Sequence, residues 1–173
     1  MLERIEAFKS LGLLTPAVYI DTDIIWLRPL NILSLLSDYW AVVCQRSFYA
    51  ETIFKSTQSH GVSFPEHENK TIGETFPILA CFTISASYHF WEELSEVLCS
   101  LPDRYRTWYG DQEALKILLS TKGEAIGFAK EEEVACLPEF FRPSEKIPYA
   151  VHFKGPSRKA QMFEAAELMG IRG

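Results

Sequence analysis

The sequence predicts a single α/β domain over residues 1–173, with a mostly parallel sheet flanked by helices. Three observations lead to this fold class. Helical and strand patterns alternate along the chain. The strand candidates are short unbroken apolar runs, which are typical of strands covered on both faces. Hydrophobic residues make up 47% of the chain and charged residues 23%, so the chain can bury a core and is not a disordered polyelectrolyte.

The N-terminal part of the chain predicts one helix, two strands and a helical turn. Residues 2–11 repeat apolar side chains every three positions, with charged side chains between them, as in a short amphipathic helix. Residues 17–20 and 24–27 are apolar runs and are expected to be buried strands. Residues 31–36 follow a proline break and predict a helical turn.

The central part predicts two strands, at residues 40–44 and 77–85, and a long irregular segment between them. That segment, residues 46–76, is polar and lacks periodicity, which indicates a functional lid or an insertion. Residues 90–101 have the clearest helical pattern of the chain, with apolar and acidic side chains on opposite faces. Ser87 is expected to cap the start of this helix.

The C-terminal part predicts two more helices, over residues 112–120 and 160–168. Asp111 stands just before the first of them and is well placed to be its N-cap. Three short strands are expected between the two helices, at residues 125–129, 134–137 and 149–153.

Charge and hydropathy exclude two classes of partner. Asp and Glu total 23 against 17 Lys and Arg, a net charge of −6, so the chain would repel a phosphate backbone and a nucleic-acid partner is not expected. Its apolar runs are far shorter than the ~20 residues that span a bilayer, so a transmembrane segment is not expected. The acidic residues near Met1 also break the pattern of a signal peptide.

The cysteines have no spacing that indicates a zinc site or a redox pair. We expect buried free thiols, which favour a reducing, cytoplasmic location. The four cysteines are Cys44, Cys81, Cys99 and Cys136. The side chains expected at the surface are Glu66, His60, His67 and His89.

Two carboxylates follow the first predicted strand, in the sequence Asp21-Thr22-Asp23. Carboxylates two residues apart at a strand end can both turn toward one cation, and hard oxygen ligands suit Mg²⁺ or Mn²⁺. Taken alone, the same pattern also fits a solvated turn between a strand and a loop. The surrounding sequence decides between these interpretations.

The stretch over residues 18–30 resembles the metal-binding D-x-D signature of GT-A-fold glycosyltransferases that use nucleotide-diphosphate sugars. It is most similar to the glycosyltransferase family 8 type and the related nucleotide-diphospho-sugar transferases. Residues 110–115 (GDQEAL) resemble the D-Q motif that opens a helix beside the donor sugar. Residues 151–159 (VHFKGPSRK) resemble the C-terminal H-F-x-G-x-x-[K/R] element. The three motifs occur in the family's order, and the resemblance covers residues 1–160.

The resemblance implies a metal-dependent glycosyltransferase that moves a sugar from a nucleotide-diphosphate sugar donor to an unknown glycan, protein or lipid acceptor. It implies Mn²⁺ (or Mg²⁺) as the cofactor, with Asp21, Asp23 and His152 as its ligands. A structural role is the alternative for His152. The resemblance also places Asp111 and Gln112 beside the donor sugar as catalytic residues, with Gln112 near the anomeric carbon.

The last motif implies a diphosphate site that includes Lys154, Gly155, Arg158 and Lys159. A cation and a divalent metal ion would together neutralise the diphosphate leaving group. Gly155 would let the backbone approach the phosphates closely. Lys154, Arg158 and Lys159 are all candidates for the cation, and the spacing in the family favours Arg158.

The sequence departs from the family at its N-terminus, because only 20 residues precede Asp21. The resemblance therefore implies an N-terminally truncated GT-A-like catalytic domain in which the nucleotide-base-binding half is largely missing. One alternative is a non-catalytic GT-A remnant that acts as a binding module. A second is a haloacid-dehalogenase-type phosphatase, but Ile25 and the residues after it do not fit the loop that follows the nucleophile of that class.

Overall fold

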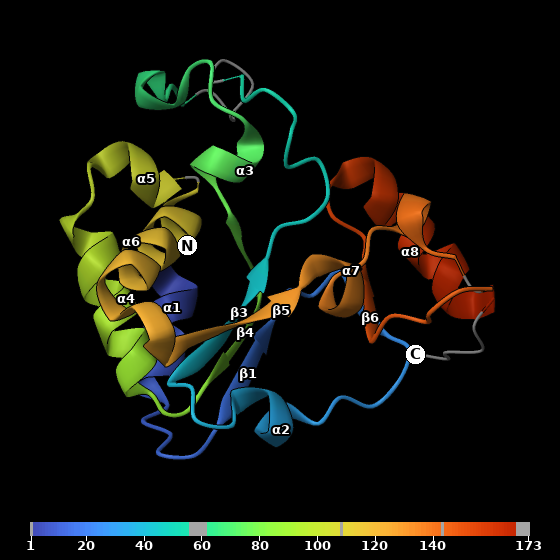
Figure 1. Cartoon of the computed structure of the whole chain (residues 1–173), viewed down its shortest axis with the longest axis horizontal. Helices are drawn as coiled ribbons and strands as arrows, with labels where there is room; N and C mark the ends of the chain where they lie inside the picture. The colour runs from blue at the N-terminus through green and yellow to red at the C-terminus, as the bar shows by residue number, and fades with distance from the viewer. Residues whose placement is uncertain (1, 56–61, 108, 143, 169–173) are drawn as a thin grey trace.

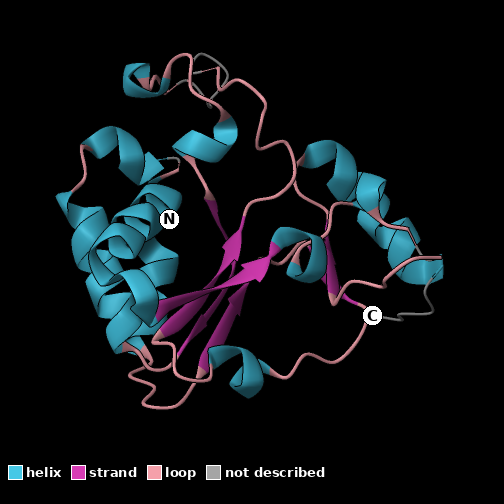
Figure 2. Cartoon of the chain, viewed as in Figure 1, coloured by secondary structure: helices cyan, strands magenta, loops and turns pink. Residues whose placement is uncertain are grey.

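The protein folds into a twisted sheet with helices on both faces, and a small two-stranded sheet lies beside it (Figures 1 and 2). This computed structural model describes residues 2–55, 62–107, 109–142 and 144–168. The main sheet has the order β1-β4-β3-β5, and the small sheet pairs β2 with β6. The strands are β1 (Ala17–Ile20), β2 (Ile24–Trp26), β3 (Ala41–Gln45), β4 (Ile78–Ser85), β5 (Ile126–Lys130) and β6 (Ala150–His152).

The sheet is mixed, and this corrects the expectation of a mostly parallel one. Strands β3 and β5 are parallel, whereas β4 runs antiparallel to both of its neighbours, β1 and β3. The two strands of the small sheet are also antiparallel. An apolar run shows that a strand is covered on both faces, but it does not show the direction in which that strand runs. The predicted α/β class is confirmed.

Three helices cover one face of the main sheet (Figure 2). They are α1 (Leu2–Ser10), α4 (His89–Ser100) and α6 (Gly110–Lys122). Their apolar sides form one core with the sheet, in which Phe90 and Trp91 of α4 pack near Leu115 of α6 and Ile5 of α1. The helices predicted at residues 2–11 and 90–101 are therefore confirmed.

A second core covers the opposite face of the sheet, beneath α2 (Ile32–Leu36) and α7 (Glu131–Val134). Asn31 caps α2 by accepting a hydrogen bond of 3.1 Å from the backbone N–H of Ser34. Cys44 and Cys81 lie in this core, Cys136 is buried nearby, and Cys99 is exposed. All four are free thiols, as expected, but the exposed Cys99 corrects the expectation that all of them are buried.

Three local predictions were wrong. Helix α6 begins at Gly110, so Asp111 lies inside its first turn, and the N-cap is Tyr109 in a left-handed conformation with φ 60°. Ser87 does not cap α4, which begins at His89 with Tyr88 at the N-cap. The strand expected over residues 134–137 is instead the end of α7 followed by a single bridge from Cys136 to Val151.

The segment expected to be irregular contains short helices over an aromatic cluster. Thr71 and Glu74 form a capping box at α3 (Ile72–Thr75), and a 3₁₀ turn spans Pro65–His67. His67 is 4% exposed and packs among Phe54, Phe64, Phe76 and Tyr105, so its predicted surface position is wrong. His60 lies outside the described residues, whereas Glu66 and His89 are at the surface, as expected.

The remaining helical segments are α5 (Asp103–Thr107), α8 (Pro156–Leu168) and 3₁₀ turns at Gly123–Ala125 and Pro138–Phe140. Helix α8 packs on the small sheet, where Met162 and Ala165 contact the cluster around Ile25 and Val151. None of the helices in the described part of the chain combines the length and the apolar composition needed to cross a membrane.

Candidate metal centre and cavity

The two aspartates lie in the short turn that joins the two sheets. Strand β1 ends at Ile20, and the backbone N–H of Asp21 donates a 3.0 Å hydrogen bond to the carbonyl of Cys81 in β4. Strand β2 then begins at Ile24, directly after Asp23. The turn is therefore fixed on one side by the main sheet and on the other by the small sheet.

Pairing of β2 with β6 brings His152 to this turn, although it is far away in the sequence. Ile24 is paired with His152 in the antiparallel ladder, and the N–H of Phe153 donates to the carbonyl of Asp23 at 2.8 Å. His152 and Asp23 are both buried, at 2% and 8% exposure. Asp21, Asp23 and His152, which the resemblance implies as ligands of one ion, therefore lie together, and an antiparallel pair of strands brings them there.

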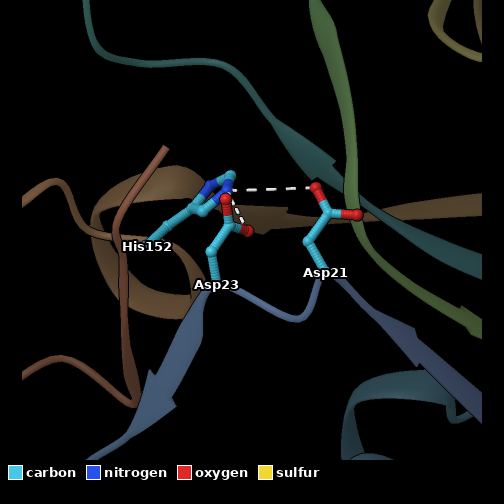
Figure 3. Close-up of side chains that lie close together, drawn as sticks. All are labelled: Asp21, Asp23 and His152. Atoms are coloured by element: carbon cyan, nitrogen blue, oxygen red, sulfur yellow. Dashed lines mark ion pairs between the residues drawn. The ribbon is translucent and has the colours of Figure 1, made fainter. Parts of the chain in front are cut away.

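Each carboxylate turns one oxygen toward the same nitrogen of His152 (Figure 3). The Nε2 atom of His152 lies 3.2 Å from Oδ1 of Asp23 and 3.9 Å from Oδ2 of Asp21. One ligand atom from each of the three residues lies within 4.8 Å of the others. Around a Mg²⁺ or Mn²⁺ ion with bonds of about 2.1 Å, ligand atoms are separated by about 3 to 4 Å. The two distances to His152 lie in this range, so the group has the ligand types and the spacing at His152 that such an ion takes.

The other oxygen of each carboxylate is held by a separate partner. Oδ1 of Asp21 accepts a 2.5 Å hydrogen bond from the Tyr19 hydroxyl and lies 3.3 Å from Nη1 of Arg4. Oδ2 of Asp23 lies 3.0 Å from Nζ of Lys159. Burial and the hydrogen bond to Asp21 raise the pKa of Tyr19, which keeps its hydroxyl available as a donor. The outer oxygens are thus anchored, and the inner ones face His152.

His152 has the orientation that a metal ligand needs. Its Nε2 atom faces the carboxylates, so the neutral form that can bind a metal carries its proton on Nδ1. Nδ1 is buried and has no hydrogen-bond partner among the described residues. Burial lowers the pKa of His152, but the neighbouring Cys81 thiol and the Asp23 carboxylate outweigh burial, so the pKa is raised. A cation would therefore compete with a proton at this nitrogen.

A cavity of about 560 Å³ opens beside these three residues, which is the size expected for a small-molecule site. Eight of the nine predicted site residues line it: Asp21, Asp23, Asp111, Gln112, His152, Lys154, Gly155 and Lys159. Leu79, Ala80 and Cys81 form part of its wall, at the place where the pairing of β4 with β3 shifts register. The shift interrupts the ladder at the edge of the cavity.

Asp111 and Gln112 reach the cavity from the first turn of α6. Asp111 is 4% exposed, and its Oδ2 forms an ion pair with Nη2 of Arg4, whose other nitrogen contacts Asp21. Arg4 therefore links the D-x-D turn to the start of α6. The side-chain oxygen of Gln112 accepts a 3.1 Å hydrogen bond from Nη2 of Arg46.

The C-terminal motif contributes two lysines and a glycine to the cavity. Gly155 has φ 89°, and open space lies around the place where a Cβ atom would be. Desolvation and the nearby Arg46 lower the pKa of Lys154, which lines the cavity although part of the residue is exposed.

Arg158 lies outside the cavity lining that the described residues form. Its guanidinium pairs with Glu139, with an Nε to Oε2 distance of 2.9 Å, and this hydrogen bonding lowers the pKa of Glu139 to about 2. The position of Arg158 therefore does not support its selection as the cation that reaches a diphosphate. Lys154 and Lys159 are better placed.

Four residues of this region were missed by the sequence analysis: Arg4, Tyr19, Arg46 and Cys81. Arg4 was counted only as part of the polar face of a helix, and Arg46 as the start of an irregular segment. Tyr19 and Cys81 were read as members of apolar runs. The alternation of Tyr19 with Asp21 along one strand was the one available signal, because residues i and i+2 point to the same face.

The similarity of this chain to known proteins lies in its fold. No protein family matches the sequence, and no curated protein is similar to it in sequence. One similar solved structure is the crystal structure of a glycosyltransferase involved in the glycosylation of the major capsid of PBCV-1. The match has a TM-score of 0.56 at 12% sequence identity and covers 93% of this chain and 71% of that chain. The chain therefore has the fold of a glycosyltransferase.

Proposed function

We propose that the protein is a metal-dependent glycosyltransferase that moves a sugar from a nucleotide-diphosphate sugar to an acceptor. One observation carries this proposal. The metal-type group Asp21–Asp23–His152 and the Asp111–Gln112 pair line the same cavity as two lysines, on a fold shared with a glycosyltransferase. A metal ion and cationic side chains can neutralise a departing diphosphate, and the polar pair can bind the sugar.

The residues that line the cavity can take two roles. Lys154 and Lys159 supply positive charge for the diphosphate, and Gly155 leaves the backbone there open to close approach. A bound Mn²⁺ (or Mg²⁺), held by Asp21, Asp23 and His152, would neutralise the diphosphate as the bond to the sugar breaks. Asp111 and Gln112 line the same cavity, and their polar groups can bind sugar hydroxyls.

The function is tested with the purified chain, Mn²⁺ and a panel of uridine- and guanosine-diphosphate sugars, by measuring release of the nucleoside diphosphate. We expect release with at least one donor, and Asp23→Asn should reduce it by about 100-fold or more. Asp38→Asn, at an exposed aspartate, is the matched control and should retain activity. Binding of donor and Mn²⁺ without turnover would instead support a non-catalytic binding module. Turnover that chelators leave unchanged would contradict the metal-dependent proposal.

A further inference from the structure

Arg46 closes the base of the segment over residues 46–76. Its backbone N–H donates to the carbonyl of Pro77 at 2.8 Å, and its Nε donates to the carbonyl of Phe76 at 2.7 Å. One arginine at the end of β3 therefore fixes the far end of the segment through two hydrogen bonds. These bonds also leave its Nη2 atom directed at α6, where Gln112 lies.

Glu131 holds the backbone directly after Arg46. Its carboxylate is 2% exposed, and one oxygen accepts hydrogen bonds of 2.8 Å from the N–H groups of both Ser47 and Phe48. The buried negative charge also acts on Arg46, since burial lowers the pKa of Arg46 and Glu131 raises it. The guanidinium is thus held by hydrogen bonds and by a buried counter-charge.

The contact between Arg46 and Gln112 fixes the orientation of the Gln112 amide. A guanidinium has only donors, so the atom of Gln112 that lies 3.1 Å from Nη2 of Arg46 has to be the oxygen. The NH₂ group of the same amide is then the polar group left for the cavity, which Gln112 lines. Reversing the amide would place two donors against each other, with no acceptor between them.

We propose that Arg46 is a positioning residue that makes Gln112 present an N–H donor, and not a carbonyl oxygen, to the bound donor sugar. This inference rests on the proposed function. The recognised group is an oxygen acceptor of the donor sugar, either a hydroxyl or the ring oxygen. In this orientation the amide stabilises an oxygen of the ligand and does not attack the anomeric carbon.

The first test replaces the two partners and measures turnover of the donor identified in the release assay. Gln112→Glu keeps the shape, pairs with Arg46 and removes the N–H donor, so we expect kcat to fall about tenfold or more. No covalent glycosyl–enzyme should be detected by mass spectrometry. Arg46→Met should also lower kcat about tenfold, Arg46→Lys should recover part of it, and the control Arg106→Met, at an exposed arginine, should not change it.

Unchanged kcat in Arg46→Met, or a covalent adduct on residue 112 in Gln112→Glu, would overturn the proposal. A second measurement does not depend on turnover. In ¹⁵N-labelled protein, the side-chain amide of Gln112 should be rigid in the wild type and mobile in Arg46→Met, as measured by NMR relaxation. A mobile wild-type amide would overturn the inference even for an active enzyme. A rigid wild-type amide that becomes mobile in Arg46→Met would support the positioning role even if no donor is turned over.

Discussion

Oδ1 of Asp23 lies 3.2 Å from Nε2 of His152, and the ladder between β2 and β6 holds the two residues side by side. A cation between them would replace this contact with two metal–ligand bonds. His152→Ala should therefore abolish the rise in melting temperature that Mn²⁺ produces in the wild type. At a concentration 100 times its Kd, a ligand stabilises a protein by about 2.7 kcal/mol, which a thermal scan can detect. His89→Ala, at an exposed histidine, is the control. Equal Mn²⁺ shifts in the two variants would exclude His152 as a ligand.

Gly155→Ala should weaken diphosphate binding, because its Cβ atom would occupy the open space that lets the backbone approach the phosphates. Residue 155 has φ 89°, so alanine would be strained there and should cost about 1–2 kcal/mol of stability. Gly12→Ala is a matched control, because Gly12 has φ 59°, also faces open space and lies before β1. Both variants should lose similar stability in urea unfolding. Only Gly155→Ala should weaken binding of the nucleoside diphosphate by calorimetry, and equal binding by the two would contradict a role for this backbone position.

The cation that reaches the diphosphate can be identified by comparing neighbouring residues on α8. Lys159 contacts Asp23 in the cavity, whereas Arg158 pairs with Glu139 outside it. Lys159→Met should weaken binding of the nucleoside diphosphate roughly tenfold, and Arg158→Met should change it less than twofold. Titration calorimetry with the metal present measures both values. A larger loss of binding in Arg158→Met than in Lys159→Met would identify Arg158 as the cation, as the spacing of the sequence motif favours.

Gly110→Ala should destabilise the fold and displace the start of α6. A Cβ atom at this position would collide with the carbonyl of Tyr105 and lie 2.7 Å from a methyl group of Leu98. We expect a loss of about 3 kcal/mol in the free energy of unfolding, the upper part of the range for overpacked sites. Gly123→Ala, at the other end of the same helix and facing open space, should lose only about 1–2 kcal/mol because of its φ of 50°. Urea denaturation separates the two.

His67 should make the protein less stable in mild acid. Burial lowers the pKa of His67, so below about pH 6.5 the unfolded chain takes up a proton that the folded chain resists. The contribution of His67 to the free energy of unfolding should therefore fall as the pH decreases from 7.5 to 5.5. His67→Gln lacks this contribution, so the wild type should lose stability relative to the variant over this range. Burial raises the pKa of the nearby Glu113, which acts in the opposite direction and is present in both proteins. Thermal scans across this range test the prediction, with His89→Gln as control. An unchanged pH profile in His67→Gln would contradict it.

Local patterns predicted the elements that carry the metal-type group, because a buried strand followed by D-x-D is a feature of neighbouring residues. Strand direction depends on how distant segments pair, so the antiparallel approach of β6 to β2 could not be read from the apolar run that contains His152. Helix α6 begins at Gly110 and not at the predicted Gln112, because Tyr109 adopts a left-handed conformation, which is uncommon for a tyrosine. The partners of Arg4 and Arg46 depend on tertiary packing, since long cationic side chains carry little local signal.

The separation of the metal-type group along the chain has a consequence for the order in which the protein matures on the ribosome. Asp21 and Asp23 are synthesised before His152, and their strand β2 has as its partner β6, which carries His152. A nascent chain that ends before residue 150 contains the residues of β1, β3, β4 and β5, yet it lacks the third ligand. Cation binding would then act late in biogenesis, by favouring the docking of β6 and protecting its amide hydrogens from exchange.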